Sequence, residues 1–190
     1  MSSETANPAD GNLWRRHSLY LLSWAHFDTA IRSIAAQVRS AEAETDCIVG
    51  ISRGGLVPAV ALSNVLGISA FHAIAMERNV GAGQYLNKQP PRVLWHGNLT
   101  AVRGRCVLVV DDVAGSGETL RSVCEQALLA EAASVRTAVI VRMQRGTSAS
   151  DFVAVELDDW VVFPWEDSEL PQGARTRQVI MPEPGRDEDC

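Results

Sequence analysis

The sequence predicts an α/β fold, in which a parallel sheet is flanked by helices on both of its faces. Short apolar runs, which are typical of strands buried on both faces, occur at 47–51, 107–110 and 135–141. The first two runs are followed by glycine-containing turns and then by apolar residues at helical spacing. Strands that alternate with helices pair in parallel, and ligands bind outside the carboxyl ends of such strands.

The composition limits the class of protein. A chain of 190 residues is long enough for one domain with a substantial core, and a net charge of −6 argues against a broad nucleic-acid surface. No apolar run reaches membrane-spanning length, and the polar N-terminus lacks the features of a signal peptide. The four cysteines do not have zinc-ligand spacing. We therefore expect a cytoplasmic protein with reduced thiols that binds neither nucleic acid nor membrane.

The expected elements follow in chain order. Residues 1–18 are polar and are predicted to be disordered, so the domain is expected to span 19–170. Ser23 is suited to cap a helix whose apolar residues recur at helical spacing through Val38. The strand at 47–51 leads into a helix that ends near Gly67, and another strand is expected over 68–76. Beyond 107–110 we expect a helix from Glu118 and strands at 135–141 and 152–155.

The residues that follow the run 107–110 have the pattern of an anion-binding site. Asp111 and Asp112 come directly after the strand, a turn of small residues spans 114–117, and Glu118 and Thr119 open a helix. Backbone N–H groups converge at such a turn, and the helix dipole favours negative charge there. The two carboxylates would repel a phosphate, so they suit ribose hydroxyls or a hydrated Mg²⁺ instead. The alternative is an ordinary strand–turn–helix connection with a polar turn.

A second turn of this kind follows the run 47–51. Two glycines beside Arg53 allow the backbone to approach an anion closely. The Arg53 side chain would add positive charge there, or would point to solvent. The alternative is a glycine-rich strand–helix turn with a surface arginine.

These two segments resemble those of a known family. The block 107–120 resembles the signature of type I phosphoribosyltransferases, and the segment 51–58 resembles the pyrophosphate loop of the xanthine–guanine enzymes. The pattern Tyr-x-x-Ser-Trp at 20–24 is similar to the start of the same enzymes. The resemblance implies a non-proline cis peptide between Ser52 and Arg53. It also implies a Mg²⁺-dependent transfer of the phosphoribosyl group of phosphoribosyl pyrophosphate to a nucleobase, by a homo-oligomer (dimer or tetramer).

The resemblance also assigns roles to residues. Asp111, Asp112 and Arg53 would be the catalytic residues, with both aspartates at the ribose and the Mg²⁺. The 5-phosphate would be held by Ala114, Gly115, Ser116, Gly117, Glu118 and Thr119. The pyrophosphate would be held by Ser52, Arg53, Gly54 and Gly55.

The base site is assigned on the resemblance of 159–166 to a C-terminal hood that covers the nucleobase. The hood is expected to span 152–170, followed by a flexible acidic tail over 171–190. Trp160 would stack on the base, Val161 would offer backbone groups to its edge, and Glu166 would lie near its exocyclic group or the metal. In the purine enzymes of the family a lysine meets the 6-oxo group of the base, and Arg142 occupies the position of that lysine. The alternative for Trp160 and Trp165 is hydrophobic packing or a subunit interface.

The polar segment 77–92 has no clear periodicity, and the family has a flexible catalytic loop there. Lys88 and Arg92 in this segment would meet phosphate, or would be solvated charges.

One position departs from the pattern of the 6-oxopurine enzymes. The third residue after the acid pair is usually a further Asp, which handles a proton on the purine ring, and here it is Gly115. Two alternatives therefore stay open. The first is a non-catalytic relative that binds nucleotide or phosphoribosyl pyrophosphate, and the second is an enzyme for a non-standard base.

Overall fold

The computed structural model describes residues 19–41, 44–79, 88–166 and 175–181. No helix within these ranges is both long enough and apolar enough to cross a membrane.

The main sheet has six strands in the order β4-β3-β2-β5-β6-β7. Their bounds are β2 Cys47–Ser52, β3 Phe71–Asn79, β4 Lys88–His96, β5 Cys106–Ala114, β6 Ser134–Met143 and β7 Phe152–Leu157. All neighbours pair in parallel except β3 and β4, which are antiparallel. The α/β prediction is therefore confirmed, with one antiparallel edge strand added to the expected parallel sheet.

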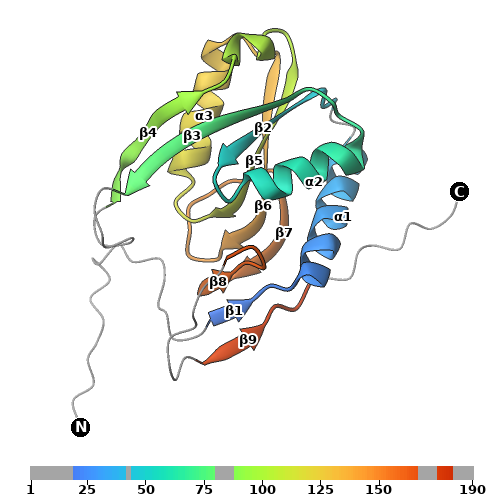
Figure 1. Cartoon of the computed structure of the whole chain (residues 1–190), viewed down its shortest axis with the longest axis vertical. Coiled ribbons are helices and arrows are strands. Elements are labelled where there is room, and N and C mark those ends of the chain that lie inside the picture. Colours follow the sequence, from blue (N-terminus) through green and yellow to red (C-terminus); the bar gives the residue numbers. More distant parts are fainter. Residues whose placement is uncertain (1–18, 42–43, 80–87, 167–174, 182–190) are drawn as a thin grey trace, which may run out of the picture.

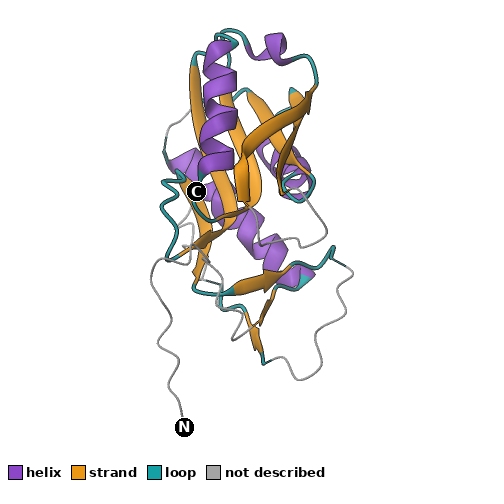
Figure 2. Cartoon of the chain, turned by 90° about the vertical axis from the view of Figure 1, so that its left-hand side faces the viewer, coloured by secondary structure: helices purple, strands orange, loops and turns teal. Residues whose placement is uncertain are grey.

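Helices cover both faces of this sheet (Figures 1 and 2). Helices α1 (Trp24–Ser40) and α2 (Leu56–Leu66) pack on one face, and α3 (Glu118–Leu129) packs on the other. The expected cap of α1 is present, because the Ser23 Oγ atom accepts a hydrogen bond from His26 N at 3.2 Å. A 3-10 turn, Leu99–Val102, precedes β5. These layers bring the carboxyl ends of β2 and β5 side by side, with Gly50 opposite Val110.

The segment 77–92 differs from the expected loop. Strands β3 and β4 extend into it and pair as a hairpin, with Glu77 opposite Arg92 and Asn79 opposite Lys88. The two prolines at 90–91 had suggested a loop, but β4 is an edge strand, where a missing N–H group is tolerated. Residues 80–87, the rest of the predicted catalytic loop, lie outside the described residues.

A second, three-stranded sheet forms the hood at the end of the main sheet (Figure 1). Its order is β8-β1-β9, and its strands are β8 Trp160–Val162, β1 Leu19–Leu21 and β9 Thr176–Gln178, all parallel. Strand β9 lies in the segment 171–190 that was expected to be a flexible tail. Val179, directly after β9, is buried in the core beside α1. The predicted hood bounds, 152–170, are therefore wrong at both ends: they include β7, which belongs to the main sheet, and they exclude β9, which belongs to the hood.

Candidate active site

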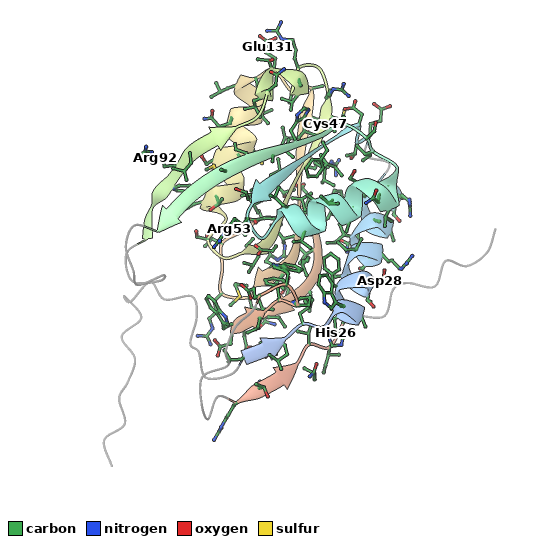
Figure 3. All side chains as sticks on the ribbon, viewed as in Figure 1. His26, Asp28, Cys47, Arg53, Arg92 and Glu131 are labelled. Atoms are coloured by element: carbon green, nitrogen blue, oxygen red, sulfur yellow. The ribbon has the colours of Figure 1, made fainter. Side chains whose placement is uncertain are left out.

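Ser52–Gly55 form the turn between the end of β2 and the start of α2. The peptide bond between Ser52 and Arg53 is cis, as the resemblance implies. The N–H groups of Leu56 and Val57 bond back to the carbonyl groups of Arg53 and Gly54, at 3.2 Å each. The Arg53 side chain is exposed, and Figure 3 shows it at the end of the sheet that faces the hood. Its contact with pyrophosphate stays a prediction.

The acid pair lies on the neighbouring strand, in the last residues of β5. The backbone N–H group of Asp112 donates to Asp111 Oδ1 at 3.0 Å, and that of Val113 donates to Asp112 Oδ1 at 2.8 Å. A Cβ atom at Gly54 would lie 1.7 Å from Asp112 Oδ2, and one at Gly55 would lie 2.7 Å from Asp111 Cα. The predicted pyrophosphate turn and the acid pair are therefore in direct contact, and both glycines are required for the approach.

Burial controls the ionisation of the acid pair. Burial raises the pKa of Asp111 well above its usual range, and the charge of Asp112 raises it further. Burial also raises the pKa of Asp112, although hydrogen bonds from Asp111 and Val113 offset part of this effect. The charge of Glu166 acts in the same direction as burial on the pKa of Asp112, so the hood carboxylate lies close enough to affect the pair electrostatically. A cation between these groups would lower both pKa values.

The acid pair fits Mg²⁺ chemically. Mg²⁺ prefers oxygen ligands and binds through one or two carboxylates together with substrate phosphates. Within the described part of the chain, no three side chains of the His, Cys, Asp and Glu types form a metal cage. A metal at Asp111 and Asp112 would therefore take its remaining ligands from substrate and water.

The predicted 5-phosphate loop connects β5 to α3. Gly117, the residue before α3, has φ +73° and supplies no side-chain hydrogen bond to the helix. The helix therefore begins at a residue that has no side-chain acceptor, and an anion at this end would interact favourably with its dipole. The loop and the acid pair lie next to each other in the chain, so a ligand could contact both.

A loop that was not predicted from the sequence packs against this turn. A Cβ atom at Gly146 would lie 2.1 Å from the carbonyl oxygen of Gly115. The Thr147 hydroxyl donates to the carbonyl oxygen of Ser116 at 3.0 Å, and a Cβ atom at Gly117 would lie 3.0 Å from Ser148 Cα. The signal was a Gly-Thr-Ser run shortly after the strand predicted at 135–141. This loop, 146–148, packs directly against the predicted 5-phosphate loop.

Three of the four predicted base-site residues lie in the hood. Trp160 and Val161 are in β8, and Val161 is buried while Trp160 is half-buried. Glu166 follows in a tight turn, where its Oε2 atom accepts from Phe163 N at 2.9 Å.

Arg142, the fourth predicted base-site residue, is turned toward β7. Its guanidinium forms an ion pair with Glu156 and donates to the Ser150 carbonyl oxygen at 3.4 Å. These three residues line a cavity of about 400 Å³ beside β7. Of the predicted base-site residues, Glu166 acts electrostatically on the acid pair, whereas Arg142 is engaged with Glu156 beside β7. The placement of Trp160 and Val161 at the base stays a prediction.

Comparison with known proteins agrees with this geometry. The family model described as a phosphoribosyl transferase domain matches residues 20–170. The xanthine-guanine phosphoribosyltransferase of Idiomarina loihiensis is 29% identical over 155 residues, which cover 80% of this chain and 90% of that protein. The corresponding protein of Cereibacter sphaeroides is 31% identical over 141 residues, covering 74% of this chain and 75% of the other.

Solved structures show the same fold. A purine phosphoribosyltransferase from Pyrococcus horikoshii superimposes with a TM-score of 0.68 at 29% identity, covering 81% of this chain and 97% of the other. A protein from Neisseria gonorrhoeae, solved with bound ppGpp, gives a TM-score of 0.64 at 24% identity, covering 80% and 90%. The second likeness concerns the fold alone.

Proposed function

Because the chain belongs to the phosphoribosyl transferase domain family, we propose that it transfers the 5-phosphoribosyl group of phosphoribosyl pyrophosphate to a purine-like base and releases pyrophosphate. This is the chemistry of purine salvage. The observation that carries the proposal is the contact of Gly54 and Gly55 with Asp111 and Asp112. It joins a predicted pyrophosphate turn and a predicted ribose site at the carboxyl ends of adjacent strands.

Each part of the site has a chemical role in this reaction. The backbone of 114–119 holds the 5-phosphate at the start of α3, and the turn 52–55 holds the pyrophosphate, with Arg53 adding charge. Asp111 and Asp112 accept hydrogen bonds from the ribose hydroxyls. Trp160 stacks on the base, Val161 meets its edge, and Glu166 lies close to both the base and the acid pair.

The transition state of such a transfer has oxocarbenium character, so positioning and charge neutralisation contribute more than activation of a nucleophile. Asp112 and Asp111 would hold Mg²⁺, which would supply charge neutralisation for the leaving pyrophosphate. The residues of the chain would align C1 of the ribose with the base and hold the 5-phosphate and the pyrophosphate at separate turns.

The base is the open part of the proposal. Arg142 is paired with Glu156, and Gly115 cannot exchange a proton, so two expected purine contacts are altered. These two observations favour, as the second candidate, an enzyme for a non-standard base over a non-catalytic relative, because both departures concern the proposed base site and not the proposed phosphate and ribose sites. A cytoplasmic location agrees with such a metabolic role.

The test is a pyrophosphate-release assay with phosphoribosyl pyrophosphate, Mg²⁺ and a panel of purines, pyrimidines and pyridines. We expect release that depends on both a base and Mg²⁺. Tight binding of phosphoribosyl pyrophosphate without release, for every base in the panel, would instead support the non-catalytic relative.

We also propose that the protein is a homo-oligomer, a dimer or tetramer. Helix α2 carries no charged residue, and Val60 on its outer side is 49% exposed. An exposed helix face without charged residues is often covered in an assembly, and the same face on a second copy would cover it. Light scattering of the purified protein tests this, and a monomer at micromolar concentration would reject it.

A further inference from the structure

The base-binding part of the hood is not a strand of the main sheet. Within the described ranges, β8 pairs with β1 and with no strand that carries a phosphate-binding loop. The acid pair and the two anion-binding turns all lie on the main sheet. The distance between the base site and the ribose site therefore depends on contacts that connect the hood to the rest of the domain.

A cluster of four aromatic rings makes such a contact. The cluster consists of Trp24 and Phe27 at the start of α1 and Phe163 and Trp165 in the hood. Trp165 stacks on Phe163 at 4.7 Å between ring centroids and 13° between planes. It meets Phe27 edge-on at 5.5 Å and Trp24 at 6.3 Å. Phe27 and Trp24 meet edge-on at 5.7 Å.

The two sides of this cluster come from different elements that share one core. Phe27 belongs to α1, whose buried residues Ile31 and Ile34 pack in the core of the main sheet. Phe163 is buried, and two hydrogen bonds join it to Glu166 across a turn. Phe163 N donates to Glu166 Oε2 at 2.9 Å, and Glu166 N donates to the Phe163 carbonyl oxygen at 3.0 Å. The start of α1 lies directly beside the hood strands (Figure 1). Trp165, which lies in the turn that carries Glu166, therefore connects this turn to α1.

We propose that Phe27 and Trp165 are positioning residues that set the base-binding segment 160–166 relative to the phosphate-binding loops. The proposal rests on the proposed function for its kinetic consequence. Neither ring needs to touch the substrate, because the effect is transmitted through Phe163 and the turn at Glu166. Loss of the bridge should therefore weaken binding of the base and leave binding of the phosphate groups unchanged.

The experiment compares Phe27→Leu with a matched core variant, Phe152→Leu. Phe152 is a buried ring of β7 in the same core cluster, and it lies away from the hood under the guanidinium of Arg136 at 5.9 Å. Both variants lose one packed ring. Trp165→Leu removes the other ring of the bridge. Phe27→Tyr is the conservative variant, because it keeps a ring at a half-buried position from which the added hydroxyl can reach solvent.

Two measurements are made on each variant. In steady-state kinetics with the base that gives the highest rate of pyrophosphate release in the panel, we expect Phe27→Leu and Trp165→Leu to raise KM for that base. The expected increase is roughly 2- to 12-fold, the range for one aromatic pair. KM for phosphoribosyl pyrophosphate should stay within about twofold, and Phe27→Tyr should restore the wild-type value for the base. In hydrogen exchange, which needs no activity, Phe27→Leu should speed exchange in 160–166 and leave 111–119 unchanged.

Several outcomes overturn the inference. The inference is wrong if hydrogen exchange in 160–166 is equally fast in Phe27→Leu and in the wild type, whatever the activity of the two proteins. A KM effect shared by Phe152→Leu, or one that falls equally on both substrates, shows a loss of general stability only. Absence of pyrophosphate release in the wild type counts against the proposed function, and the exchange result then decides the inference alone.

Discussion

A Cβ atom added at Gly54 would lie 1.7 Å from the Oδ2 atom of Asp112, a separation that no pair of non-bonded atoms tolerates. The backbone of the turn after β2 thus occupies space that only glycine leaves open, and it places that turn against an acidic side chain on the neighbouring strand. The relationship explains why position 54 is glycine, and we expect the turn to be sensitive to substitution.

The first prediction follows from this contact. Gly54→Ala should displace Asp112 and lower kcat/KM by about 10²-fold, because a misplacement near 1 Å in a site of this kind has such an effect. Gly67→Ala is the control, since Gly67 has φ +73° with open space around it and lies away from the site. The control should lose stability without losing activity once folded. Equal activities of Gly54→Ala and wild type would show that Asp112 has no role.

The second prediction concerns the charge of Asp112. Asp112→Asn keeps the shape of the side chain and its bond from Val113 but removes the negative charge. We expect turnover to fall by roughly 10²-fold and the Mg²⁺ concentration for half-maximal rate to rise. Steady-state rates over a Mg²⁺ titration measure both effects. An unchanged Mg²⁺ requirement would place the metal elsewhere.

The third prediction is a pH dependence of stability without divalent cations. Folding raises the pKa of Asp111 from 3.8, so the native state keeps a proton that the unfolded chain releases. The free energy of unfolding should therefore fall as the pH rises from about 3.8 through the raised pKa, because over this range the native state binds more protons than the unfolded chain. Asp111→Asn should reduce this loss, which urea unfolding at several pH values would measure. A variant with the same slope as wild type would contradict the prediction.

The fourth prediction tests the support of the phosphate loop. A Cβ atom at Gly146 would lie 2.1 Å from Gly115 O, a backbone atom that cannot move aside as a flexible side chain can. Gly146→Ala should weaken binding of ribose 5-phosphate about tenfold or more, on the scale of one lost charge-assisted hydrogen bond. Calorimetry against Gly104→Ala, where the added atom meets open space, separates this effect from general destabilisation. Equal affinities in the two variants would show that 146–148 is only a connection.

The sequence predicted those parts of the molecule that depend on local patterns. Buried strands, the Ser23 cap, and the two glycine-containing turns follow from residues that are adjacent in the chain, and the resemblance supplied the cis peptide at Ser52. The remaining features depend on distant partners. Strand β9 has three exposed residues and exists because it pairs with β1, and Arg142 turned toward Glu156 because β7 lies beside β6. The support of Gly115 by Gly146 could be seen only once both loops were placed.

The last prediction concerns the departure at Gly115. In 6-oxopurine enzymes of this family, the position usually holds an Asp that exchanges a proton with the purine ring, and a positioned acid or base is worth about 10²–10⁴ in rate. We therefore expect guanine, xanthine and hypoxanthine to be poor substrates of the wild type. Positive φ angles among the described glycines occur at Gly67, Gly104 and Gly117, so the φ angle at 115 does not require glycine.

Gly115→Asp should accordingly raise kcat/KM for the three oxopurines, while Gly115→Asn, which cannot exchange a proton, should not. Glu118 is the other acid near this turn, but a first-turn glutamate acts chiefly on the helix dipole. Steady-state kinetics with each base measure the effect. Wild-type values above about 10⁴ M⁻¹s⁻¹, within the ordinary range for enzymes, would show that the missing carboxylate is not needed and that the oxopurines are the natural substrates.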